Sequence, residues 1–315
     1  MLTARPIMER VGAFSLRDLM ALTGTPDRGL AEQLRTAAIT QAWQDFGGIR
    51  SSGLGLPIGP DGRATEQPVI RPLDGGGARA DFRGGLIELD PAGRTSGKRT
   101  RQADIWFAGI ECRIRQESVD EIQGAVGVVV PASHTGQSFA FPESGDPFEL
   151  GPDGNRIVSI EQRVYQGPPD NVRLHCVLVE HDSGDLDDIR KAVQEAVTEA
   201  AKVAGAVLGI PSEALDSDHG FLNTVTVTLT DRIAGALGAG DDLYTPQALL
   251  IRADEMLGAP TFSQHTLTRS DDPRALEYTH MQVVTGIDDG GDRGDYAFYF
   301  RVALYDIEPI LIGHT

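Results

Sequence analysis

The sequence predicts a mostly β fold with α-helical insertions, in which an antiparallel β-sandwich carries a helical hairpin. Short runs of strand-forming residues, separated by turn residues, recur over residues 104–315. A helical periodicity interrupts them at about 185–238. Before the sandwich, residues 1–44 predict a small helical arm, and residues 45–103 predict a Gly/Pro-rich module with a linker.

The helical arm is expected to contain two short helices. Ser15 is a suitable N-cap for the first, which ends at Gly24, and a second is expected over roughly residues 28–44. Two helices joined by a tight turn also occur in DNA-binding proteins. The net charge of −18 repels phosphate backbones, so a docking or oligomer-forming hairpin is the expected role.

The charge balance limits the partners of the chain. The 46 acidic and 28 basic residues disfavour nucleic acid and anionic membranes, and they favour solubility and cation binding. The N-terminal residues lack an apolar run followed by a small-residue cleavage site, so a cytoplasmic location is expected. Export by a non-classical route stays open. No run approaches the roughly 20 apolar residues of a spanning helix.

The stretch IWFAGIECRI (105–114) predicts a strand with a bulge near Ala108 and Gly109. Further strands are expected at AVGVVVP (125–131), RIVSIEQRVY (156–165), VRLHCVLVE (172–180), PQALLIRAD (246–254), SQHTLTR (263–269), EYTHMQVVTG (277–286) and YAFYFRVALYDI (296–307). The Gly/Ser/Pro-rich residues 138–154 are expected to form an excursion between strands, and residues 90–101 are expected to form a basic linker.

In the last strand, one face is expected to be apolar and Arg301 to lie on the other. The apolar face consists of Tyr296, Phe298, Phe300, Val302 and Leu304. Cys112 and Cys176 both lie in apolar strand-like runs, so buried free thiols are expected rather than a disulfide. Two cysteines so far apart do not have the paired spacing of a zinc site.

The helical hairpin begins at Asp185, a good N-cap, and its first helix is expected to end near Gly209. One apolar stripe is formed by Leu186, Ile189, Val193, Val197, Ala200, Ala204 and Val207. The second half is ambiguous, because residues 222–230 alternate like a strand but also continue a helical face that ends at Gly238. The helix is favoured, and both interpretations stay open.

Paired glycines and an LGLP sequence mark the segment from about residue 40 to 90. The matching residues are Trp43, Gly47-Gly48, Leu54-Gly55-Leu56-Pro57, Phe82 and Gly84-Gly85 followed by Leu86-Ile87. They resemble one LGFP-type repeat, a module of actinobacterial envelope-associated proteins. The resemblance implies noncatalytic binding of an envelope component or glycan through Trp43, Leu54, Gly55, Pro57 and Phe82. The same residues also fit a small structural cap on the sandwich.

Aspartates gather at several predicted loops, most densely in GIDDGGDRGDY at residues 286–296. This stretch matches neither an EF-hand loop, since Gly290 takes the third position, nor the GGxGxD repeat. A turn between two strands is therefore expected there. No cofactor is certain, but a calcium (Ca2+) site built from separate loops stays open. Its candidate ligands are Asp241, Asp242, Asp288, Asp289, Asp292 and Asp295.

Catalytic motifs are missing from the sequence, which contains no G-x-S-x-G, P-loop, HExxH or Rossmann fingerprint. His175 and His181 are six residues apart, so they are expected on one strand face, with Asp182 nearby. They suggest either a metal or acid–base site or polar residues on a solvated sheet face, and the solvated face is favoured. A metal-dependent hydrolase is thus the third functional hypothesis.

The leading functional hypothesis is a noncatalytic binding protein that engages a cell-envelope component or a protein partner, with calcium as an optional aid. The second hypothesis is a self-assembling or effector-type protein whose helical hairpin rearranges to form an oligomer or to enter a membrane. Both hypotheses leave a homo-oligomer open. Without such a rearrangement, membrane contact is disfavoured.

Overall fold

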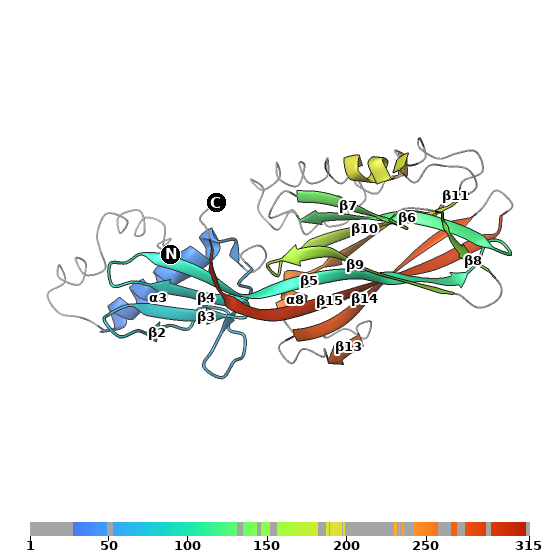
Figure 1. The fold of residues 1–315 in the computed structure, drawn as a ribbon. Coiled ribbons are helices and arrows are strands. Elements are labelled where there is room, and N and C mark those ends of the chain that lie inside the picture. Colours follow the sequence, from blue (N-terminus) through green and yellow to red (C-terminus); the bar gives the residue numbers. More distant parts are fainter. Residues whose placement is uncertain are drawn as a thin grey trace. The chain divides into compact units, whose positions relative to one another are not determined.

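The chain is described from a computed structural model (Figure 1), which is mostly β, with antiparallel sheets and few helices. Contacts divide the chain into two units, Met1–Gln102 with Asp306–Thr315, and Ala103–Tyr305. The structure describes residues 28–48, 53–130, 135–143, 146–151, 156–181, 187–188, 190–196, 198, 230–231, 233, 235, 242–257, 266–269, 275–287 and 291–312. Among the described helices, none combines the length and apolar character needed to cross a membrane.

In the first unit, one helix packs on an antiparallel sheet. The elements are α3 (Arg28–Asp45), β1 (Pro57–Ile58), β2 (Arg71–Pro72), β3 (Ala78–Phe82), β4 (Gly85–Leu89), and parts of β5 (Thr95–Ile114) and β15 (Arg293–Leu311). Helix α3 buries Ile39, Ala42 and Trp43 against the sheet. It ends where Gly47 and Gly48 adopt positive φ, which only glycine adopts without strain. The helix predicted over 28–44 is confirmed.

Strands β3 and β4 form a tight hairpin in which Phe82 pairs with Gly85. A side chain on Gly85 would clash, because its Cβ would lie 2.1 Å from the Lys98 carbonyl and 2.7 Å from Leu54. The sheet can therefore close over this hairpin only with glycine at position 85.

The basic linker predicted at residues 90–101 is wrong. Residues 95–99 of β5 pair with β4, from Leu89↔Thr95 to Gly85↔Arg99. The preceding turn is held by Asp90, which accepts hydrogen bonds from the Ala92 and Arg94 amides. On the core side of this strand Gly97 lies against the Phe46 ring, so the buried face carries no apolar side chain that the sequence pattern could display.

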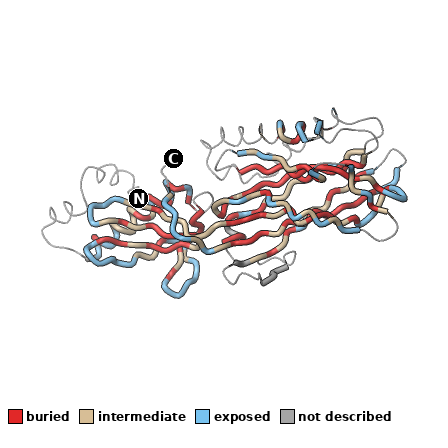
Figure 2. Tube along the Cα trace, in the orientation of Figure 1, coloured by how far each residue is buried: buried red, intermediate tan, exposed pale blue. Residues whose placement is uncertain are grey.

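The second unit is the predicted antiparallel β-sandwich (Figures 1 and 2). One sheet contains the remaining parts of β5 and β15, with β9 (Ile157–Gly167), β14 (Ala275–Ile287) and β13 (Thr266–Arg269). The other contains β6 (Asp120–Val130), β7 (Thr135–Phe141), β8 (Phe148–Leu150), β10 (Val172–Glu180), β11 (Asp242–Leu243) and β12 (Gln247–Ile251). A short helix, α8 (Ala253–Leu257), follows β12. Buried side chains lie along both sheets.

Most strand predictions in this unit are confirmed, including the apolar face of β15 from Tyr296 to Leu304. The register of β5 against β9 shifts between Phe107 and Gly109, where a bulge was expected. Residues 138–154 are not simply an excursion, because they contribute to β7 and contain β8. Cys112 and Cys176 are buried free thiols, and burial raises the pKa of both.

A helix covers the outer side of the β6–β10 sheet. Described residues between Asp187 and Thr198 are helical, and Ala192, Val193 and Ala196 pack against apolar side chains of β6 and β10. Strand β10 is thus buried on both faces, which explains its unbroken run VRLHCVLVE. This part of the predicted hairpin is confirmed. Residues 199–229, with nearly all of the ambiguous segment 222–230, and the helix expected between Ser15 and Gly24 lie outside the described residues.

The sandwich core predicts a large loss of stability for Phe107→Ala. The Phe107 ring lies 5.1 Å from Phe141 and 5.4 Å from both Phe298 and Phe300, centroid to centroid. Deleting it should lower the free energy of unfolding by about 3–5 kcal/mol, measured by chemical denaturation. As the control, Ile157→Ala, at a side chain 68% exposed, should change it by less than about 0.5 kcal/mol. Equal losses would contradict this core.

Candidate functional site

The residues predicted to bind a ligand in the first unit come together, but mostly inside its core. Trp43, Leu54 and Phe82 are all buried, and the Trp43 and Phe82 ring centroids are 5.6 Å apart. Pro57 pairs with Phe82, and Gly55 supplies a left-handed turn with φ 66°. These side chains hold the 53–58 segment against the helix and the sheet, so any ligand on this surface would meet other residues.

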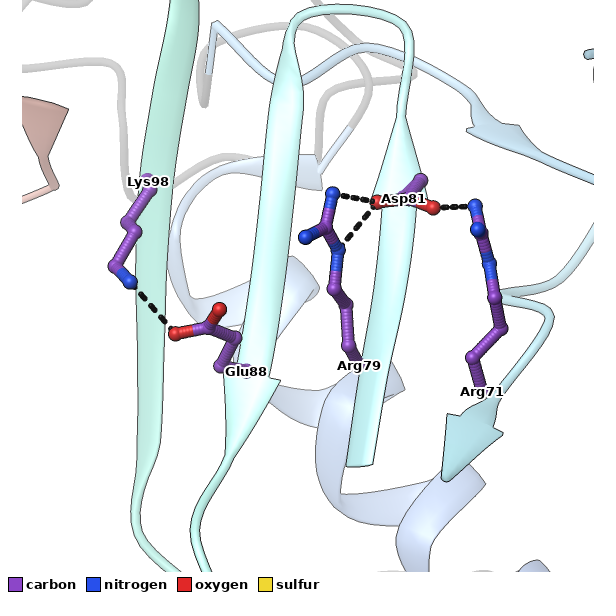
Figure 3. Close-up of polar contacts among 5 residues, drawn as sticks. All are labelled: Arg71, Arg79, Asp81, Glu88 and Lys98. Carbon is purple, nitrogen blue, oxygen red and sulfur yellow. Dashed lines mark hydrogen bonds and ion pairs between the residues drawn. The ribbon is translucent and has the colours of Figure 1, made fainter. Parts of the chain in front are cut away.

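The face of this sheet that points away from α3 carries ion pairs across its strands (Figure 3). Asp81, whose side chain is 9% exposed, binds both Arg71 and Arg79, with Arg79 Nε donating to Oδ1 at 2.7 Å. Lys98 Nζ donates to Glu88 Oε2 at 2.6 Å. These pairs tie β2 to β3 and β4 to β5, and they neutralise most of the charge on this face.

Charge is unequally divided between the two units. The first unit holds 14 of the 28 basic and 13 of the 46 acidic residues, and the second holds the other 14 and 33. The acidic character of the chain therefore belongs to the β-sandwich. A ligand that binds the sandwich must tolerate a strongly negative field.

The predicted metal ligands do not form a cluster in the described part of the chain. Asp242 lies in β11, Asp292 is exposed, and Asp295 accepts two hydrogen bonds from Arg293, at 2.9 and 2.8 Å. Asp241, Asp288 and Asp289 lie outside the described residues. Where residues are described, no group of three or more His, Cys, Asp or Glu side chains is placed to hold a metal ion.

The stretch GIDDGGDRGDY connects β14 to β15, as expected for a turn, with Ile287 paired to Arg293. The other acidic segment lies beside it, because the Thr245 amide donates to the Thr285 carbonyl at 2.9 Å. The Tyr244 ring fills the space at the base of this hairpin, where a Cβ on Gly286 would come within 2.9 Å of it. The two segments predicted to share a metal thus meet through an aromatic contact.

A buried carboxylate, which no pattern in the sequence predicts, lies next to this contact. Asp120 is fully buried and accepts hydrogen bonds from the Gln116 and Glu117 amides and, at 2.5 Å, from the Tyr296 hydroxyl. Burial and the bond to Asp120 raise the pKa of Tyr296. All three donors are internal, so Asp120 closes the β5–β6 turn as a structural residue.

The two histidines considered for catalysis have different environments. The expectation of a solvated sheet face is wrong for His175, which is fully buried and has no hydrogen-bond partner among the described residues. Desolvation, and then the charge of Arg173, lowers its pKa to about 4. His181 is partly exposed, and its Nδ1 lies 3.0 Å from Gln123 Nε2. His175 therefore stays neutral at pH 7.

A concave site lies along one side of the sandwich, between β7 and β9. Among the described strands, β7 pairs only with β6, and β9 pairs only with β5. Both are therefore edge strands of their sheets. A cavity of about 480 Å³ opens between these edges. Its lining includes the apolar Val128, Val130 and Phe139, the exposed Gln137 and the buried Asp170. We call this seam the edge groove.

The edge groove continues along the same two strands. A second cavity of about 250 Å³ is lined by Phe141 and Pro142 on one side and by Ile160 on the other. The Gln162 amide donates to Glu143 Oε1 at 3.2 Å across this part of the groove. The groove thus follows β7 and β9 over most of their length, as a channel between the two sheets.

Both edge strands carry features that limit unspecific pairing. Strand β9 has two register shifts against β5, and Glu161 adopts a left-handed φ of 53°. On β7, Gln194 of the covering helix accepts a hydrogen bond from Ser138 at 2.9 Å and donates to the Gly136 carbonyl at 3.3 Å. The edge groove therefore lies between two edges that are protected against indiscriminate aggregation.

Acidification should destabilise the sandwich through His175. The unfolded histidine titrates near pH 6.5 and the folded one near 4, so between these values the unfolded chain binds the extra proton. This contribution to stability is complete above pH 6.5 and is lost as the pH falls toward 4. From pH 7 to 5 it amounts to about 2 kcal/mol. Urea unfolding of His175→Leu should show a correspondingly smaller fall, whereas His181→Leu should match the unmodified chain. Equal falls in all three would contradict the burial of His175.

Comparison with known proteins adds no assignment: no protein-family model matches the chain, and no curated protein is similar to it. The resemblance of residues 40–90 to an LGFP-type repeat therefore stays a prediction. The features that bear on function are the edge groove, the charge of the sandwich and the side chains on its outer faces.

Proposed function

We propose that this chain is a noncatalytic binding protein that holds an extended, apolar segment of a partner protein in the edge groove. The observation that carries the proposal is the groove itself, an apolar channel bounded by two edge strands. Its larger cavity, about 480 Å³, falls within the roughly 300–1,000 Å³ of known binding pockets.

An extended peptide suits the groove better than a compact ligand. The outer edge of a sheet presents backbone N–H and C=O groups in a row, and an added strand can bond to them. Strand β7 contains seven residues, so its edge is about 23 Å long, and the Gly136 carbonyl on this strand already accepts a hydrogen bond from Gln194. The side chains of a bound strand that point inward would rest on Val128 and Val130.

The charge of the sandwich favours a partner segment that combines apolar with basic residues. Asp170 and Glu143 lie at opposite ends of the groove, and the surrounding unit holds 33 of the 46 acidic residues. Such a field accelerates the approach of cationic segments and disfavours acidic ones.

Peptide selection followed by groove filling would test this function. A phage-displayed random peptide library is selected on the purified protein, and enriched peptides are expected to alternate apolar residues and to carry basic ones. Gln137 is exposed, and in Gln137→Trp the larger side chain should fill the groove. The variant should weaken peptide binding at least about tenfold, since a loss of about 1.4 kcal/mol of binding free energy raises the Kd tenfold.

The matched control makes the same change outside the groove. Gln67 is exposed in the first unit, so Gln67→Trp should leave peptide affinity unchanged. Peptides that bind the Gln137→Trp and Gln67→Trp variants equally well would contradict the proposal, and so would a selection that enriches no sequence.

Calcium assistance is the secondary part of the proposal, supported by the contacts of Tyr244 and Thr245 with residues 285–286 and 294. Millimolar calcium should raise the melting temperature relative to EDTA, because a ligand that binds only the folded state stabilises it. Magnesium should have a smaller effect, and Asp242→Asn should reduce the calcium effect. An unchanged melting temperature removes calcium from the proposal and leaves the groove unaffected.

A further inference from the structure

We propose a second binding site, for a neutral glycan, on the outer face of the sheet formed by β9, β5, β15 and β14. The site is centred on Trp106 and does not depend on the edge groove. Along β5, Ile105 and Phe107 point into the sandwich core, so Trp106 between them points outward. Its ring is only half-buried, whereas Trp43, the other tryptophan, is buried.

Two arginines from neighbouring strands flank the Trp106 ring. Arg163 on β9 pairs with Trp106, and its Cζ lies 5.7 Å from the ring centroid. Arg301 on β15 places its Cζ 5.5 Å from the same centroid. Their side chains are 45% and 37% exposed, so the guanidinium groups border the ring at the surface. Cation–π attraction fixes the orientation of all three groups.

Carboxylates hold both arginines in place. Arg301 Nη2 donates to Glu161 Oε2 at 2.8 Å, and Arg163 Nη1 lies 3.6 Å from Asp104 Oδ2. Guanidinium and carboxylate groups therefore lie together beside one aromatic ring. A guanidinium has more N–H groups than one carboxylate can use, so donors remain at the solvent side.

Glu161 lies in the register shift of β9 against β5, and its backbone adopts a left-handed conformation there. Its φ of 53° makes it the one non-glycine residue with positive φ in the described part of the chain. Its ion pair with Arg301 is half-exposed on both sides, and such pairs contribute less to stability than a left-handed backbone costs. Strain that the local contacts do not offset is typical of functional positions.

The site extends along β15 to a second aromatic side chain. Tyr299 lies two residues before Arg301 on the same face, about 7 Å away along the strand. Its hydroxyl donates to Glu111 Oε2 at 2.5 Å. Across the neighbouring strands, Glu111 pairs with the exposed Ile157, and Tyr299 pairs with the exposed Met281. Trp106 and Tyr299 thus lie on the neighbouring strands β5 and β15, on the same outer face of the sheet.

This chemistry fits a polyhydroxylated ligand without net charge. A sugar hydroxyl both donates and accepts, so it can bond to a guanidinium and a carboxylate at once, while the C–H face of the ring rests on an aromatic side chain. The sandwich holds 33 acidic against 14 basic residues, which disfavours an anionic ligand, and the two arginines disfavour a cation at the ring.

Affinity electrophoresis of the full chain in gels that contain neutral polysaccharides (mannan, galactan or glucan) tests the site. At least one polysaccharide should retard the protein and change its tryptophan emission. Trp106→Ala should lower that affinity at least fivefold and abolish the emission change, whereas Trp43→Phe should preserve both. Equal retardation of the Trp106→Ala variant would overturn the proposal, and so would a lack of retardation by every polysaccharide.

A second variant separates binding from folding. Glu161→Gly removes the carboxylate and also relieves the left-handed strain. It should lower glycan affinity at least threefold without lowering the melting temperature, whereas unchanged affinity would contradict a role for Glu161. Peptide binding in the edge groove should be the same in Trp106→Ala as in the unmodified chain. The two sites can therefore fail independently.

Discussion

The separation of the two sheets of the sandwich is set by a layer of aromatic rings. Phe107 from one sheet meets Phe141 from the other, and Phe298 and Phe300 complete the layer at centroid distances between 5.1 and 5.7 Å. Rings of this size keep facing sheets about 10 Å apart. Toward the β7–β9 side, the facing residues are the shorter Val128 and Val130. They leave the space unfilled, and the edge groove is the consequence.

The same sheets present very different outer faces. Over β6 and β10, apolar side chains meet a covering helix, so that sheet is buried on both sides. Over β5 and β15, the outward positions carry Trp106, Tyr299 and Arg301, which remain partly exposed. A polar residue at an outward position costs little where water reaches it, and much where a helix lies above it. His175, which is buried and has no hydrogen-bond partner in the part of the chain that the structure describes, shows that cost.

The sequence predicted those parts of the fold in which each strand reveals its own environment. Alternation identified the two faces of β15, and continuous hydrophobicity identified β10. Prediction from apolar residues failed at residues 95–101, where Gly97 fills a core position without an apolar side chain. It also failed at β7, where the inward Thr135 and Gln137 line a groove and not the core. A pattern of apolar residues cannot show a buried glycine or an inward polar residue.

The candidate sites were much harder to predict than the fold. The edge groove joins strands separated by β8 along the chain, and the Trp106 cluster draws its residues from three strands. Their proximity depends on strand pairing, which single-residue patterns do not specify. The predicted Trp43 and Phe82 did meet, because local turns suffice to bring them together. Their contact serves the interior of the first unit.

The two buried thiols can report when the two sheets of the sandwich separate. Cys112 and Cys176 belong to facing sheets and to the same core, while the first unit contains no cysteine. A thiol-reactive reagent can reach either sulfur only when the sheets part, and burial suppresses the reactive thiolate until then. The rate at which the thiols are modified therefore measures how often the sheets separate.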